Sequence, residues 1–100
     1  ALNLRYVTAA SFKEAMSIVA EQGRPRMVIT DVHLPDGDGI TLLRSLRAKY
    51  GEAVPVIIVS GEVEERISAQ AMSAGATKYL TKPVNRRKLF SEIRETLSLM

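Results

Sequence analysis

The 100-residue chain contains no cysteine and no tryptophan, and it has a single histidine, His33. The absence of cysteine excludes disulfides and thiolate metal sites, and it favours a reducing compartment such as the cytoplasm. A lone histidine excludes zinc sites that are built on histidine pairs. No apolar run approaches the ~20 residues that cross a bilayer, and the first residues do not resemble a signal peptide. We therefore expect a soluble, unprocessed chain that does not associate with membranes.

The charge and the composition are those of an ordinary globular domain. The formal net charge is only +3, and the basic residues are scattered along the chain. Such a charge gives no basis for direct contact with nucleic acid. With 46% hydrophobic and 25% charged residues, the chain is long enough for one hydrophobic core. We expect a single domain over residues 1–100.

Strand and helix patterns alternate along the whole sequence. Residues 27–32 and 55–60 are nearly continuous apolar runs, as in strands that are covered on both faces. Ser11 and Asn85 are suited to cap helices, and Gly51 is suited to end one. The expected strands are residues 4–9, 27–32, 55–60 and 78–80, and the expected helices are residues 11–23, 40–50, 64–74 and 85–100, the last with Leu89, Ile93, Leu97 and Met100 on its inner face. This (βα)4 order predicts a parallel sheet with right-handed crossovers.

Three polar residues stand where the expected strands end: Asp31, Ser60 and Lys82. In a parallel sheet these ends meet at one edge, where open α/β sheets bind ligands. A carboxylate in an apolar strand is costly unless a cation lies near it, and Lys82 could provide that cation and also hold a phosphoryl group. Ser60 could donate to a phosphoryl oxygen, beside the backbone N–H of Gly61. Each residue alone also has an ordinary interpretation, as a turn residue, a strand-ending hydroxyl or a surface lysine.

The remaining polar motifs indicate no other chemistry. The loop after Asp31 has too few acids for an EF-hand, so we assign it to a turn and a helix start that Asp38 caps. The His33 side chain receives no catalytic role. Glycine-rich nucleotide loops and a G-x-S-x-G elbow are absent from the sequence, so we expect no bound nucleotide cofactor. No histidine is placed to activate Ser60 as a nucleophile, and we expect that the chain is not an enzyme.

Three ordered motifs resemble the receiver domain of two-component response regulators: DVHLPDGDG from Asp31, VPVIIVSG ending at Gly61, and GATKYLTKP ending at Pro83. The resemblance implies a flavodoxin-like (CheY-like) fold and a cytoplasmic phosphorelay role. It implies that Asp31 accepts a phosphoryl group from a histidine kinase or phosphotransfer protein, that Ser60 and Lys82 contact this group, and that Asp31 and the His33 backbone carbonyl bind Mg²⁺. Ser60 and Tyr79 would form the switch, although Tyr79 also fits an ordinary half-exposed strand aromatic.

One part of the family pattern is not found in this sequence. The family's domain opens with a central strand that ends in two acidic residues, followed by a helix, and here we expect a receiver domain without this first unit. Because the acidic pair is absent, we hypothesise weak Mg²⁺ binding and weak or no phosphorylation, unless the native protein contains the missing unit or another chain supplies it. Open strand edges favour a homodimer by strand pairing or swapping, or pairing of residues 4–9 with 27–32. The alternative function is a phosphorylation-independent pseudo-receiver that acts as an interaction or dimerisation module.

Overall fold

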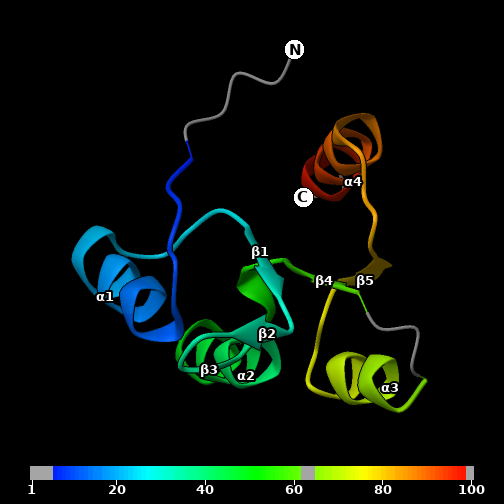
Figure 1. Ribbon diagram of the computed structural model, residues 1–100. Coiled ribbons are helices and arrows are strands. Elements are labelled where there is room, and N and C mark those ends of the chain that lie inside the picture. Colours follow the sequence, from blue (N-terminus) through cyan, green and yellow to red (C-terminus); the bar gives the residue numbers. More distant parts are fainter. Residues whose placement is uncertain (1–5, 62–64, 99–100) are drawn as a thin grey trace.

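A three-stranded parallel sheet forms the centre of the fold (Figure 1). The computed structural model describes residues 6–61 and 65–98. The strands are β1 (Val28–Asp31), β4 (Val56–Ser60) and β5 (Lys78–Thr81), in the spatial order β1-β4-β5. Their parallel pairing brings the carboxyl ends of the strands to one edge, as the alternating pattern predicts.

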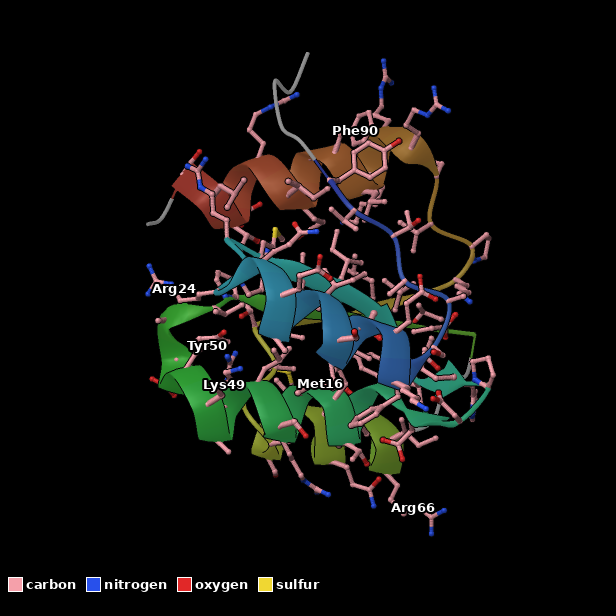
Figure 2. The ribbon with its side chains drawn as sticks, turned by 90° about the vertical axis from the view of Figure 1, so that its left-hand side faces the viewer. Met16, Arg24, Lys49, Tyr50, Arg66 and Phe90 are labelled. Atoms are coloured by element: carbon pink, nitrogen blue, oxygen red, sulfur yellow. The ribbon has the colours of Figure 1, made fainter. Side chains whose placement is uncertain are left out.

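Among the described residues, four helices flank this sheet: α1 (Phe12–Gln22), α2 (Gly39–Tyr50), α3 (Glu65–Ser73) and α4 (Arg86–Ser98). Figure 1 shows α4 on one side of the sheet and α2 and α3 on the other. In Figure 2, Phe90 marks α4 at one end of the molecule, and Lys49 and Tyr50 mark α2 toward the other. None of the helices in the described part of the chain has the length and apolarity needed to span a membrane. The four predicted helices are confirmed, except that a start at Glu64 and an end at Met100 lie outside the described residues.

The core lies between the sheet and α2. Val56, Ile57 and Ile58 of β4 have no exposed surface, and Leu43 of α2 is also fully buried. This explains why the predicted strand at residues 55–60 is continuously apolar, since a central parallel strand is covered on both faces. The core therefore holds β4 in place. Because β1 and β5 pair with β4, the carboxyl ends of these strands are also positioned.

Local capping signals in the sequence act as predicted. The Ser11 hydroxyl accepts the N–H of Glu14 at 3.1 Å, and an Asp38 carboxylate oxygen accepts the N–H of Thr41 at 2.7 Å. Asn85 accepts the N–H of Lys88 at 2.8 Å, at the start of α4. Side chains of this kind satisfy N–H groups that have no partner within the helix. These helix starts are therefore encoded locally.

The predicted strand at residues 4–9 is wrong in its described part. Residues 6–9 form no strand and do not pair with β1, while residues 4–5 lie outside the described residues. Tyr6 is 84% exposed and Val7 is 59% exposed, so their side chains gain little from burial. Strand propensity reflects packing on a sheet, and without that packing a β-branched and aromatic segment does not become a strand.

Two further elements differ from the prediction. On α4, Glu92 and Thr96 are the buried residues, while the predicted inner-face residues Leu89, Ile93 and Leu97 are only half-buried and Met100 lies outside the described residues. The helix is therefore rotated so that two polar residues also face inward. The loop after Asp31, assigned to a turn, contains a small antiparallel hairpin of β2 (His33–Leu34) and β3 (Gly37–Asp38).

Candidate functional site

Asp31, Ser60 and Lys82 lie at the same edge of the sheet, as their spacing predicts. Asp31 ends β1 and is in register with Val59, while Ser60 ends β4 and is in register with Thr81. The backbone N–H of Lys82 donates to the Ser60 carbonyl oxygen at 2.7 Å. Parallel pairing thus brings together residues that are separated by 51 positions in the sequence.

The side chains of Asp31 and Lys82 form a direct ion pair, in which the Lys82 ammonium group donates to Asp31 Oδ2. The Asp31 side chain is 35% exposed and that of Lys82 is 48% exposed, so a solvent-borne group can reach both. A carboxylate in this position can act as a nucleophile toward phosphorus, and the lysine can neutralise the charge of an incoming phosphoryl group. The pair therefore has the charges that a phosphoacceptor site needs.

The two predicted switch residues, Ser60 and Tyr79, lie on the neighbouring strands β4 and β5. Ser60 has no exposed surface, and Tyr79 of β5 is half-buried and packs against the hydrophobic core. Tyr79 is in register with Ile58, two residues before Ser60 on the neighbouring strand. Their proximity agrees with a coupled pair, whereas contact of the Ser60 hydroxyl with a phosphoryl group stays a prediction.

The sequence did not reveal the role of Asp36. Its Oδ1 accepts the N–H of Phe12 at 2.7 Å, and its Oδ2 accepts the N–H of Lys13 at 3.0 Å. These two backbone hydrogen bonds, first that from Lys13 and then that from Phe12, hold the pKa of the Asp36 carboxyl below its usual value. No local pattern could identify this contact, because the partners lie 23 and 24 residues away in the sequence.

The residues present do not by themselves fit a complete magnesium site. Mg²⁺ prefers six oxygen ligands in octahedral geometry and commonly uses one or two carboxylates with phosphate and water. Across residues 6–61 and 65–98, no group of three or more Asp, Glu, His or Cys side chains could hold a metal ion. Asp31 supplies one carboxylate, which already contacts Lys82, and the His33 carbonyl could supply one further oxygen.

An open hollow of about 620 Å³ lies beside the ion pair, on the side of the sheet that α4 occupies. Lys82 borders it, and the rest of its lining is mostly apolar, including Ile29, Val59 and Leu89. Ile29 is 39% exposed there. The site thus consists of the Asp31–Lys82 ion pair and an adjacent, mostly apolar hollow.

Comparisons with known proteins agree with this geometry. The chain is 43% identical over 74 residues to the KDP operon transcriptional regulatory protein KdpE of Escherichia coli (strain K12), which covers 74% of this chain and 32% of that protein. It is 34% identical over 96 residues to the transcriptional regulatory protein KdpE of Staphylococcus aureus, covering 94% and 41% of the two chains. The chain therefore spans well under half the length of these relatives.

The solved structures give the same result. The crystal structure of a response regulator receiver domain protein from Clostridium thermocellum has a TM-score of 0.82 and 31% sequence identity, covering 92% of this chain and 73% of that one. This similarity confirms the predicted flavodoxin-like, CheY-like fold class. Residues 2–94 match the family described as the response regulator receiver domain. The chain belongs to the response regulator receiver domain family of two-component signalling.

Proposed function

We propose that Asp31 accepts a phosphoryl group from a histidine kinase or phosphotransfer protein in the cytoplasm. The observation that carries this proposal is the half-exposed ion pair of Asp31 with Lys82 at the carboxyl edge of the sheet. An Asp31 carboxylate oxygen forms the new P–O bond while the P–N bond of the donor phosphohistidine breaks and the imidazole leaves. The acceptor is a side chain of the protein itself, so we propose no enzymatic turnover of a separate substrate.

The phosphoryl group would change the charge balance of the sheet edge. By analogy with other phosphorylated side chains, it adds close to two negative charges and three strong acceptors. Lys82 lies where it can pair with these charges. Movement of Ser60 toward the phosphoryl group and of Tyr79 into the space it leaves would reshape the surface of β5 and α4. The output would be a changed protein-binding surface, without direct contact of this chain with nucleic acid.

The relatives suggest where such a surface would act. Both KdpE proteins are described as transcriptional regulatory proteins, and this chain covers 32% and 41% of their lengths. We propose that the chain provides the phosphorylation-controlled part of a regulator of this kind. Receiver domains generally bind Mg²⁺ at the phosphorylation site, and we propose weak Mg²⁺ binding by Asp31 and the His33 carbonyl.

The test is the intact mass of the folded chain after incubation with acetyl phosphate, with either Mg²⁺ or a chelator present. We expect one phosphoryl adduct on the parent chain and none on Asp31→Asn. Asp38→Asn is the matched control, because Asp38 is a second carboxylate in the same loop and caps α2. An adduct on Asp31→Asn, or none on a folded parent chain, would overturn the assignment of Asp31 as acceptor.

A second candidate is a phosphorylation-independent interaction module that forms a homodimer by strand pairing. Among the described residues, β1 pairs only with β4. The N–H groups of Val28 and Val32 donate toward the β4 side, so the intervening backbone groups of Ile29 and Asp31 point to the other edge. An open edge with an exposed apolar side chain favours pairing with a second strand.

Light scattering over a range of protein concentrations tests this candidate. We expect a dimer that Ile29→Lys disrupts and that Met72→Lys leaves intact, because Met72 is similarly exposed but lies on α3. A monomer at every concentration would eliminate the homodimer.

A further inference from the structure

The Asp36 carboxylate attaches the hairpin that follows Asp31 to the start of α1. Only Val32 separates Asp31 from β2, and Asp36 lies in the turn between β2 and β3. The two oxygens of Asp36 accept the N–H groups of Phe12 and Lys13 at 2.7 and 3.0 Å. Figure 1 shows the start of α1 beside this hairpin. The contact therefore joins the loop of the candidate acceptor to a helix that precedes it in the chain.

This arrangement goes beyond what α1 needs as a helix. Ser11 already caps α1 through the N–H of Glu14 at 3.1 Å. The first N–H groups of an exposed helix can also bind water, so α1 does not require a partner from a distant loop. Asp36 instead contributes a charge-assisted, two-oxygen contact, which restricts position more than a single hydrogen bond does.

The other end of the hairpin is held as well. Asp38 caps α2 through the N–H of Thr41 at 2.7 Å, and the N–H of Gly39 donates to the Val32 carbonyl oxygen at 2.8 Å. Gly37 lies beside the Phe12 side chain. The segment from Asp31 to Gly39 is thus tied to α2 through Asp38 and Gly39, and to the start of α1 through Asp36 and Gly37.

We propose that Asp36 is a positioning residue for the phosphoacceptor site, because it holds the β2–β3 hairpin against α1 and thereby orients the backbone that leaves Asp31. Loss of the Asp36 contact removes both of the hydrogen bonds from α1 to this turn. The backbone at Val32 and His33 then gains freedom, and the Asp31 carboxylate is held less firmly against Lys82. This proposal rests on the proposed function of Asp31 as acceptor and adds a residue that does not touch the phosphoryl group.

The experiment compares Asp36→Ala with Ser11→Ala. Both changes remove side-chain hydrogen bonds from the first turn of α1, but only Asp36 also belongs to the hairpin. Two quantities are measured at a temperature where circular dichroism shows both variants folded. These are the initial rate of Asp31 phosphorylation by acetyl phosphate, and amide hydrogen exchange in peptides that cover residues 32–38.

For Asp36→Ala we expect about tenfold faster exchange in the hairpin and a labelling rate about fivefold lower, because the hairpin loses its two hydrogen bonds to α1. For Ser11→Ala we expect faster exchange in α1 only, with the labelling rate within about twofold of the parent. Asp36→Asn keeps one acceptor oxygen and should give an intermediate result, which also serves if Asp36→Ala does not fold.

Equal effects of Asp36→Ala and Ser11→Ala on both quantities would overturn the proposal and leave Asp36 as a helix cap. Faster hairpin exchange with an unchanged labelling rate would also overturn the positioning role. If the parent chain takes no phosphoryl group, the proposed acceptor function fails, and the positioning role fails with it. The exchange comparison then still shows whether Asp36 couples the hairpin to α1.

Discussion

At the scale of single residues, the backbone around the proposed acceptor Asp31 requires a glycine at position 39. A Cβ atom at Gly39 would lie 2.1 Å from the carbonyl oxygen of Asp31 and 3.0 Å from its carbonyl carbon. These are backbone atoms of β1, so they cannot move without shifting the strand that carries Asp31. Gly39 is not among the glycines with positive φ. The requirement for glycine at this position therefore comes from the lack of space for a side chain and not from the backbone conformation.

We therefore predict that Gly39→Ala lowers the free energy of unfolding by about 3 kcal/mol, the upper part of the range for overpacked sites. Urea unfolding followed by circular dichroism measures this. Gly61→Ala is the matched control, because a Cβ atom at Gly61 would meet nothing within 4 Å. We expect the control to change stability by less than about 0.5 kcal/mol. Equal stability of the two variants would contradict the steric argument.

At the scale of elements, Arg47 connects the end of α2 to two loops. Its Nε and Nη2 donate to the Gly75 carbonyl oxygen at 3.1 and 2.7 Å, and its Nη1 donates to the carbonyl oxygens of Gly51 and Val54. One guanidinium thus satisfies three backbone acceptors, at the end of α3 and around the turn before β4. A planar group with five donors suits this role, and lysine could not reproduce it.

We predict that Arg47→Met destabilises the protein by about 3 kcal/mol, because partly buried carbonyl groups lose their donors while the apolar stem is kept. Arg44→Met is the control, since Arg44 is an exposed arginine on the same helix. Its effect should stay below about 0.5 kcal/mol in urea unfolding. A similar loss in both variants would mean that helix charge, not the three carbonyl contacts, determines the effect.

The elements also show what the sequence could predict and what it could not. Helix starts at Ser11, Asp38 and Asn85 were predictable because each cap and its N–H partner lie three residues apart. The proximity of Asp31 and Lys82 was predictable because the carboxyl ends of parallel strands lie at the same edge of a sheet. The Asp36 contact depends on which distant segments pack together, and so does the absence of a strand at residues 6–9. Local sequence patterns cannot predict such packing.

At the scale of the whole molecule, the protein is compact although the described residues form a central sheet of only three strands. The radius of gyration is 12.8 Å, close to the ~13 Å expected for a folded domain of this length. The attachment of α4 differs from that of the other helices, because its buried residues are Glu92 and Thr96. The Thr96 hydroxyl has no hydrogen-bond partner within the described part of the chain. The ion pair of Glu92 with Lys78 of β5 therefore contributes to the attachment of α4 to the sheet.

Lys78 of β5 is central to these contacts. Its ammonium group pairs with Glu92 and lies 3.1 Å from Glu95, while Lys88 lies 3.0 Å from Glu92. The hydrogen bond from Lys78, followed by that from Lys88, holds the pKa of Glu92 below its ordinary value of 4.5. The hydrogen bond to Glu92 raises the pKa of Lys78 above 10.5. The pair is therefore fully charged between these two values.

The sign of the resulting pH dependence follows from these directions. A carboxyl group with a lowered pKa contributes stability above its ordinary pKa, and this contribution disappears as the pH falls through the folded-state value. An ammonium group with a raised pKa contributes below 10.5 and loses its contribution as the pH rises through the raised value. The attachment of α4 should thus be strongest at intermediate pH.

We predict that Lys78→Met lowers the free energy of unfolding by about 2 kcal/mol at pH 7, because the buried Glu92 carboxylate loses its main partner. The difference from the parent chain should shrink as the pH falls below 4.5 toward the lowered folded-state pKa of Glu92, because the parent loses the pair as the pH passes through that pKa. Arg94→Met is the control, since it removes one positive charge from the exposed side of α4. Urea unfolding of the three proteins from pH 3 to pH 8 decides the matter. A difference that stays constant over this range would mean that packing of the Lys78 side chain, and not its charge, holds α4 in place.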